Sequence, residues 1–338
     1  MAPVLVTGSA GFIGFHTARR LLERGETVVG LDNLNDYYEV SLKEARLERL
    51  RAYPNYRHHH LDVADRPGMA ALFEAERPDR VVHLAAQAGV RYSVEHPEAY
   101  VDSNVVGFLT VLQGCRAVKA RHLVFASTSS VFGANGRLPF AVEDAVSHPL
   151  TTYAATKLAN EAMAHAYAHL FDLPCTGLRF FTVYGPWGRP DMALFKFTRA
   201  ILEGRPIDVY GQGEMERDFT FVDDIVEGVI AALDRPAHAD EGWNAEQPNP
   251  ATSGVAPWRI LNLGAGRREQ LMRYIRVLEE KLGREAQLNL MPVQDGDVRR
   301  TEADVAATRA ALDYAPSTPI DVGVGRFVDW YVEFYGRP

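Results

Sequence analysis

The chain has 338 residues, 47% of them apolar, and its formal net charge at pH 7 is −8. This length and apolar content are enough for one large core, or for a core with a smaller lobe. The acidic balance argues against a nucleic-acid partner, and the longest apolar stretches are far too short to span a membrane.

A glycine-rich turn follows the first predicted strand. Residues 3–6 form a valine-rich apolar run and residues 12–23 have helical periodicity, so the glycines between them lie in a strand-to-helix turn. Glycine lets the backbone approach a pyrophosphate, whose charge is met by unpaired amides and by the positive end of the helix. A second predicted strand, residues 27–31, is followed directly by Asp32, where the acid that binds an adenosine ribose is expected. Its carboxylate would repel a 2′-phosphate, so the pattern favours NAD over NADP.

Two features bear on the cellular compartment. The chain enters its first strand directly, which leaves no room for a signal peptide. Its two cysteines, Cys115 in a predicted helix and Cys175 at a predicted strand start, do not make a disulfide framework and are expected to be buried thiols. We therefore expect a cytoplasmic protein.

The first half of the chain alternates strands and helices. After the second strand, further strands are predicted at residues 57–61, 80–84 and 122–126, with helical stretches between them. This alternation predicts an α/β fold with a Rossmann-type, doubly wound parallel sheet. A ligand is then expected beyond the carboxyl ends of the strands, in the loops that follow them.

The alternation of strands and helices ends at about residue 185, after which the predicted elements become shorter and richer in proline and glycine. A polar loop at residues 234–257 and a final helical stretch near residues 322–334 belong to this part. We expect a Rossmann domain over residues 1–185 and a smaller C-terminal α/β substrate lobe over residues 186–338. This boundary is approximate and allows the segments to interleave.

A predicted helix at residues 151–170 carries Tyr153 and Lys157 on one face, because residues four apart are neighbours on a helix. A tyrosine with its ordinary pKa is a poor base at neutral pH, but a nearby ammonium and an oxidised nicotinamide would stabilise the phenolate. We therefore expect tyrosine to carry the proton and lysine to lower the pKa of tyrosine. The hydroxyls of residues 127–130, at the end of the preceding strand, are candidates to bind a substrate oxygen beside it.

These residues resemble the extended short-chain dehydrogenase/reductase family and, within it, the nucleotide-sugar 4-epimerases. The resemblance covers nearly the whole chain and is greatest for the UDP-glucuronate 4-epimerases, whose AGVRYS and RFFTVYGPWGRPD strings are similar to residues 88–93 and 179–191. The other similar strings are TGSAGFIG at residues 7–14, HLAAQ at 83–87, YAATK at 153–157 and RDFTFVDD at 217–224.

The resemblance implies a mechanism in which NAD takes a hydride from C4 of the sugar while Tyr153, assisted by Thr128, takes the proton of the 4-hydroxyl. The 4-keto sugar then rotates and receives the hydride on its other face, without net redox change. Tyr153 and Lys157 also belong to the expected cofactor site. Its other members are Gly8, Gly11, Phe12, Ile13, Gly14, Asp32, Asn33, Asp62, Val63, Leu84, Ala85, Ala86, Gln87, Asn104, Ser127 and Phe180.

The resemblance also implies contacts with a UDP-sugar. A 4-keto glucuronate is a β-keto acid that can lose CO2, so the site must hold the carboxylate charged and out of alignment with the carbonyl. An arginine with hydroxyls suits that task. The candidates for the carboxylate are Ser129, Ser130, Thr182 and Arg189, those for uridine diphosphate are Arg217, Gln294 and Asp297, and Arg91 is a weaker substrate candidate.

Other activities stay open. The 4,6-dehydratases of the family carry Asp and Glu after the threonine, and glucuronate decarboxylases carry Ser and Glu, whereas this chain has Ser129 and Ser130. Ordinary UDP-glucose/galactose 4-epimerases have Asn where this chain has Thr182. Outside catalysis, a Rossmann protein can sense NAD, although such proteins commonly lack the tyrosine and lysine.

Several other patterns have simpler interpretations. The three histidines at residues 58–60 alternate along a strand, so we expect no metal site. His165 and His169 are expected on an exposed or interface helix face, and the charged residues 43–51 on a solvated one. The family is often dimeric through two helices, which here correspond to residues near 97–117 and 151–170, so we expect a homodimer.

Overall fold

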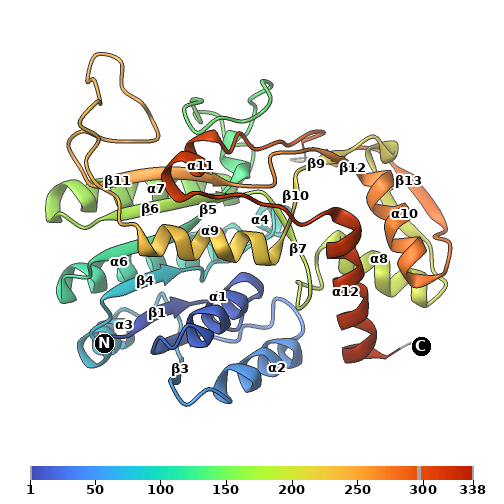
Figure 1. Ribbon diagram of the computed structural model, residues 1–338, viewed down its shortest axis with the longest axis horizontal. Coiled ribbons are helices and arrows are strands. Elements are labelled where there is room, and N and C mark those ends of the chain that lie inside the picture. The colour runs from blue at the N-terminus through green and yellow to red at the C-terminus, as the bar shows by residue number, and fades with distance from the viewer. Residues whose placement is uncertain (1, 295–297, 337–338) are drawn as a thin grey trace.

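The core of the protein is a seven-stranded parallel sheet, seen in the computed structural model, which describes residues 2–294 and 298–336 (Figure 1). The strands lie in the order β11-β6-β5-β4-β1-β2-β3, so the chain reverses its direction of winding between β1 and β4. The crevice at such a reversal is where doubly wound sheets bind ligands. The bounds are Val4–Thr7 (β1), Val28–Asp32 (β2), Tyr56–His60 (β3), Arg80–His83 (β4), His122–Thr128 (β5), Cys175–Phe180 (β6) and Trp258–Leu263 (β11).

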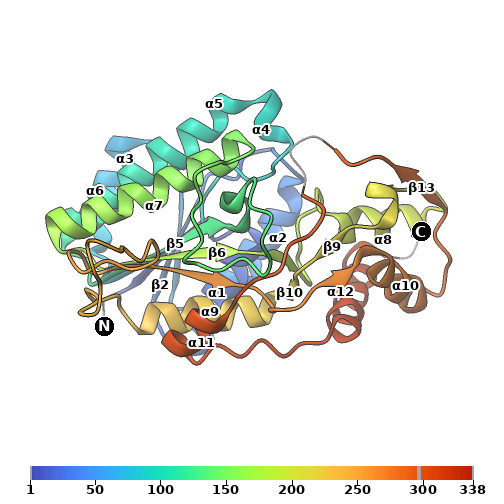
Figure 2. The same cartoon turned by 90° about the horizontal axis from the view of Figure 1, so that it is seen from above.

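Helices cover both faces of the sheet, with α3, α6 and α7 on one side and α1, α9 and α11 on the other (Figure 2). The N-termini of α3 and α7 are capped by Asp65 and Thr151, which accept hydrogen bonds from Gly68 N and Ala154 N. The bounds are Phe12–Glu23 (α1), Val40–Arg51 (α2), Arg66–Glu76 (α3), Tyr92–Glu95 (α4), Pro97–Tyr100 (α5), Gly107–Val118 (α6), Thr152–Phe171 (α7), Val222–Asp234 (α9) and Ala306–Leu312 (α11), with a π-helical turn at Val101–Val106 and 3-10 turns at Ser129–Phe132 and Gly211–Gly213.

The second half of the chain builds a smaller lobe beside the carboxyl ends of the strands. It also supplies strand β11 to the main sheet and helix α9 to one face of that sheet. The two expected parts therefore interleave, and residue 185 does not divide the chain into two separate units. The elements of the lobe are β7 (Thr182–Tyr184) paired with β10 (Phe219–Phe221), β8 (Ile207–Tyr210) with β13 (Leu288–Met291), β9 (Glu216–Arg217) with β12 (Glu269–Gln270), and the helices α8 (Ala193–Leu202), α10 (Leu271–Leu282) and α12 (Ile320–Tyr335).

The predicted strands and the two long predicted helices are confirmed to within one or two residues at most ends. Cys115 and Cys175 are buried free thiols, as expected. The expected solvated face at residues 43–51 is wrong for Lys43 and Arg46, which are 4% and 0% exposed. Helix α2 packs this side against the glycine-rich turn and the loop 185–189, whose carbonyl groups accept hydrogen bonds from Nη1 and Nη2 of Arg46.

On the helix face of His165 and His169, His169 is exposed, as expected, and His165 is half-buried. Nε2 of His165 lies 2.9 Å from Ser253 Oγ, and Nδ1 of His169 lies 2.8 Å from the carbonyl oxygen of Val255. The two rings therefore hold the loop 234–257 against α7. Across the described ranges, no group of three or more His, Cys, Asp or Glu residues has a metal-binding arrangement, and no helix is long and apolar enough to cross a membrane.

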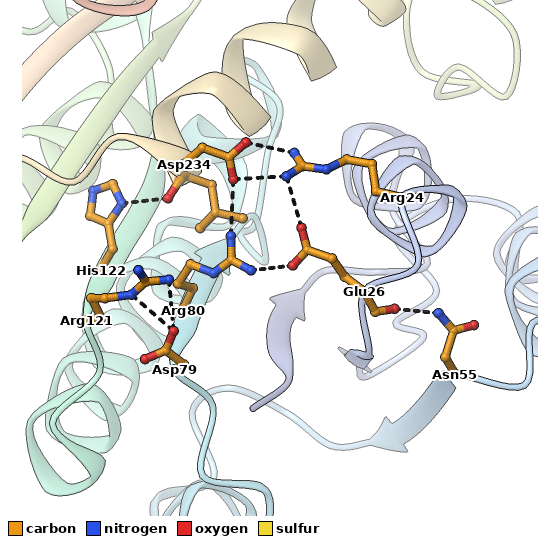
Figure 3. A network of polar contacts seen from close by, with 9 residues as sticks. Arg24, Glu26, Asn55, Asp79, Arg80, Arg121, His122 and Asp234 are labelled. Carbon is orange, nitrogen blue, oxygen red and sulfur yellow. Dashed lines mark hydrogen bonds and ion pairs between the residues drawn. The ribbon is translucent and has the colours of Figure 1, made fainter. Parts of the chain in front are cut away.

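Ion pairs hold helices and strands together at the amino ends of the strands, opposite to their carboxyl ends (Figure 3). Arg24 at the end of α1 pairs with Asp234 at the end of α9 at 2.8 Å, and Arg80 of β4 reaches the same carboxylate at 3.2 Å. Arg80 also pairs with Glu26, and the buried His122 lies 3.3 Å from the carbonyl oxygen of Leu233. This network ties α1 and α9 to the sheet far from the expected site.

Candidate functional site

A cleft of about 250 Å3 lies at the carboxyl ends of the strands of the first half. Sixteen of the eighteen expected cofactor residues line it, with Thr128 and Arg189. Asp62 and Asn104 are not part of its lining and lie behind residues that are. Nδ2 of Asn33 donates to Asp62 at 2.7 Å, and Asn104 accepts from the Gln87 amide at 2.8 Å. The sequence thus located the cleft, while these two side chains support its wall.

The glycine-rich turn has the shape that a pyrophosphate requires. Gly8 has a φ of +71°, and a Cβ there would lie 2.7 Å from the Ala85 nitrogen. A Cβ on Gly14 would lie 2.0 Å from the carbonyl oxygen of Gly8, so α1 starts directly against the turn. Larger side chains would fill this cradle, which therefore fits a dinucleotide.

Asp32 is tied to the same turn. Its Oδ2 accepts a hydrogen bond from the Ala10 amide at 3.1 Å, and its Oδ1 accepts one from the Leu34 amide at 2.9 Å. The carboxylate is 8% exposed and lines the cleft, so its remaining lone pairs are available to a ribose diol. The arrangement fits NAD.

Tyr153 and Lys157 enter the cleft from the first turns of α7. Burial raises the pKa of Tyr153, while a hydrogen bond with Thr128 and the charge of Arg189 oppose that rise. Burial also lowers the pKa of Lys157 to about 8, against the opposing charge of Glu161, and its ammonium donates to the carbonyl oxygen of Ala126 at 2.9 Å. In this structure Thr128 and Arg189 therefore favour the phenolate, and the lowering expected from Lys157 stays a prediction for the protein with its cofactor.

Sequence reasoning missed a buried ion pair beneath these residues. Glu161, one turn beyond Lys157 on α7, accepts from Arg179 of β6 through Nε at 3.0 Å and Nη2 at 2.9 Å. Ser127 donates to the same carboxylate at 2.5 Å. The arginine and the glutamate side chains are 2% and 7% exposed, so the pair fixes β6 against α7, and Ser127 fixes the end of β5 to the same carboxylate. The four-residue spacing from Lys157 was the available signal for Glu161.

Arg189 lies between the cofactor cleft and a smaller adjoining pocket that Thr182 also lines. Its guanidinium donates to Asp191 through Nε at 3.0 Å and Nη2 at 2.5 Å. Tyr37 donates to the same carboxylate at 3.2 Å. Arg189 therefore lines both pockets, and an internal carboxylate binds two of its donors; its role as a clamp for a substrate carboxylate stays a prediction.

The other expected substrate residues are more dispersed. Ser129 and Ser130 form the short turn after Thr128, and the Ser130 amide donates to Thr128 Oγ1 at 3.2 Å. Arg91 lies over the ring of Tyr210 at 4.8 Å. The remaining three lie in the smaller lobe or outside the described residues: Arg217 on β9, Gln294 after β13 with a buried Oε1 that has no hydrogen-bond partner among the described residues, and Asp297 outside the described ranges.

Several lining residues were not expected from the sequence. Lys43 donates to the side chain of Asn35 at 2.7 Å and lies 4.6 Å from the centre of the Tyr38 ring. Burial lowers the pKa of Lys43, and the nearby charge of Asp32 opposes this. The tyrosine doublet at residues 37–38, close after the ribose acid, was a signal for this wall of the cleft.

Comparisons with known proteins agree with this geometry. Residues 4–245 match the NAD dependent epimerase/dehydratase family. A probable UDP-glucuronate 4-epimerase from Rhizobium meliloti is 47% identical over 333 residues, which cover 98% of each chain. UDP-glucuronate 4-epimerase 1 from Arabidopsis thaliana is 43% identical over 338 residues, covering 98% of this chain and 77% of the plant protein. The crystal structure of UDP-glucuronic acid 4-epimerase from Bacillus cereus, in complex with UDP-glucuronic acid and NAD, matches with a TM-score of 0.87 at 30% identity, covering 98% of this chain and 100% of that one.

Proposed function

The chain belongs to the NAD dependent epimerase/dehydratase family, and on that premise we propose that it is a UDP-glucuronate 4-epimerase, which interconverts UDP-glucuronate and UDP-galacturonate. The observation that carries the proposal is that Tyr153, Lys157 and Thr128 line one dinucleotide cleft, with Arg189 at its border. The relatives named UDP-glucuronate 4-epimerases support the choice of substrate.

The residues of the cleft divide the chemistry between them. NAD, when bound, supplies a reversible acceptor for the C4 hydride. Tyr153 removes the proton of the 4-hydroxyl and later returns it, and Thr128 keeps the phenol oriented and favours its ionised form. Lys157 lies one turn away on the same helix, where its positive charge favours the phenolate once the nicotinamide is oxidised.

The carboxylate of the sugar must remain attached to C5 while C4 is a ketone. Arg189 and Thr182 share the adjoining pocket, and Ser129 and Ser130 follow Thr128 directly. In the proposed complex, these groups hydrogen-bond the carboxylate and keep its bond to C5 out of line with the carbonyl π system, so that this bond does not break. The uridine diphosphate is assigned to Arg217, Gln294 and Asp297, with Arg91 as a further contact.

A test separates this activity from decarboxylation. UDP-glucuronate carrying deuterium at C4 is incubated with the purified protein, and the product is examined by mass spectrometry. A new product that separates from UDP-glucuronate by chromatography, with unchanged mass and with deuterium retained at C4, supports epimerisation by internal return of the label. Loss of CO2 identifies a decarboxylase, and turnover restricted to UDP-glucose or UDP-galactose identifies a neutral-sugar 4-epimerase. NAD binding without turnover of any UDP-sugar supports a sensing role.

The assembly and the compartment are part of the same proposal. Helix α7 presents a stripe of small apolar residues outward, with Ala155, Ala162 and Ala166 exposed and Leu170 65% exposed. Such a face next to α6 supports a homodimer formed through these two helices. The free, buried Cys115 and Cys175 support a reducing, cytoplasmic location. Light scattering of the wild-type protein and of Ala162→Glu tests the dimer, which the charge should disrupt.

A further inference from the structure

Three successive backbone carbonyl groups hold the loop that leads into Arg189. Nε2 of His16, on α1, lies 2.9 Å from the carbonyl oxygen of Pro186. Nη2 of Arg46, on α2, donates to the carbonyl oxygens of Trp187 at 2.6 Å and Gly188 at 3.3 Å. Both side chains come from the cofactor-binding half, so this half binds each of the three residues that precede Arg189.

Arg46 also holds the glycine-rich turn. Its Nη1 donates to the carbonyl oxygen of Ala10 and to the hydroxyl of Tyr38, both at 2.8 Å. The Ala10 amide in turn donates to Asp32, so the peptide groups on both sides of this residue are fixed. A single guanidinium therefore connects the turn that cradles the pyrophosphate with the loop that presents Arg189.

Both side chains are deeply buried although they are polar. Arg46 is 0% exposed and, among the described residues, forms no ion pair. A buried cation without a counter-charge is costly unless its donors are hydrogen-bonded. Here carbonyl groups and the Tyr38 hydroxyl accept from Nη1 and Nη2, while Nε has no hydrogen-bond partner among the described residues. His16 is 4% exposed, and burial lowers its pKa to about 3, so the ring is neutral and its Nε2 carries the hydrogen that Pro186 accepts.

The loop needs this support because its backbone is unusual. Trp187 has a φ of +62°, a left-handed conformation that is unfavourable for a bulky residue. Its ring packs 5.6 Å from that of Phe15 and lies under the guanidinium of Arg49 at 4.3 Å. Strained residues of this kind persist when their surroundings fix them, and they concentrate at ligand sites.

We infer that His16 and Arg46 are positioning residues that fix the loop 185–189, and through it Arg189, relative to the cofactor turn. The catalytic part of this inference rests on the proposed function. A hydride transfer requires the nicotinamide, held by the cofactor half, and the sugar, held in part by Arg189, to be in register. A displacement of about 1 Å in such a site can lower the rate by about 100-fold.

The test combines hydrogen exchange with kinetics. In His16→Leu and Arg46→Met, the peptide covering residues 185–192 should exchange its amide hydrogens at least about tenfold faster than in the wild type. The value of kcat should fall by about 10- to 100-fold, while KM changes much less. His16→Gln keeps a donor near the position of Nε2 and should restore both properties. Arg46→Lys keeps the charge but not the fork, so it should show the defect even if Arg46→Met does not fold.

The matched control is His122→Leu, the same substitution at a buried histidine on the opposite edge of the sheet (Figure 3). It should lower the melting temperature without accelerating exchange at residues 185–192 or lowering kcat. The inference is overturned if the His16 and Arg46 variants leave exchange at residues 185–192 as slow as in the control, or accelerate it equally in all segments. Hydrogen exchange tests the fixing of the loop even if the protein turns over no UDP-sugar. A failure of this inference can therefore be distinguished from a failure of the proposed function.

Discussion

Arg189 meets its expected partner, a carboxylate, inside the protein: Asp191 binds its Nε and Nη2 at 3.0 and 2.5 Å. The pair lies at the border of the cofactor cleft, where the arginine side chain is 23% exposed. Desolvation and the charge of Arg189 act in opposite directions on Asp191, and the pKa of this carboxyl is lowered overall. The acid is therefore ionised at neutral pH, and it holds Nε and Nη2 of the arginine.

Arg189→Ala should weaken binding of UDP-glucuronate much more than binding of UDP-glucose. Removing one partner of a buried charge pair costs about 2–5 kcal/mol, and only the acidic sugar makes that pair. Titration calorimetry with the two nucleotides, on protein of known NAD content, measures the difference. Equal losses for both sugars would show that Arg189 binds the shared nucleotide part and not the carboxylate.

Tyr153→Phe should keep the fold and the cofactor but lower kcat by about 100- to 10,000-fold, which is the usual contribution of a positioned acid–base group. The ring contributes packing, and only the hydroxyl that meets Thr128 is lost. The measurement is a steady-state assay beside the absorbance ratio that reports bound NAD. Activity within a few-fold of the wild type would assign the proton transfer to another group. Thr128→Val is the companion variant, with a smaller expected loss.

Asp32→Ser should relax the preference for NAD. The carboxylate lies at the end of β2 and repels a 2′-phosphate, whereas a serine hydroxyl does not. Lys43 adds a positive charge close by, which the substitution leaves without the opposing acid. Fluorescence titration of the cofactor-free variant with NADP should give a binding constant closer to that for NAD. An unchanged preference for NAD over NADP would show that the shape of the cleft, and not Asp32, distinguishes the two cofactors.

The protein should lose stability as the pH falls below 6.5. Burial lowers the pKa of His16, His83 and His122 from 6.5 to about 3. The unfolded chain therefore binds more protons than the folded chain between these values, and the free energy of unfolding decreases as pH falls through that window. Melting temperatures between pH 7 and 5 test this, because most carboxyl groups titrate lower. His122→Gln removes one of the three groups and should flatten the slope, and an unchanged slope would contradict the assignment.

The parts of the site that the sequence predicted are those that local pattern determines. The glycines, Asp32, Tyr153 and Lys157 have fixed spacings on a strand, a turn or one helix face, and all of them line the cleft. The fold followed from the alternation of strands and helices for the same reason.

What the sequence did not predict depends on contacts between distant segments. Helix α2 is polar along its length, so nothing local indicates that Arg46 is buried against the loop 185–189. Glu161 and Arg179 are 18 residues apart and meet only because α7 packs on β6. The interleaving of β11 and α9 with the main sheet likewise arises from the return of the chain after the smaller lobe.

The most direct measurement is proton NMR of the product formed from UDP-glucuronate by the purified protein. The account predicts a product of unchanged mass whose C4 proton has the small couplings of an equatorial position, as in a galacturonate. A product that has lost CO2, or a C4 proton that keeps its large axial couplings after long incubation with active protein, would contradict the assignment of this site as a UDP-glucuronate 4-epimerase.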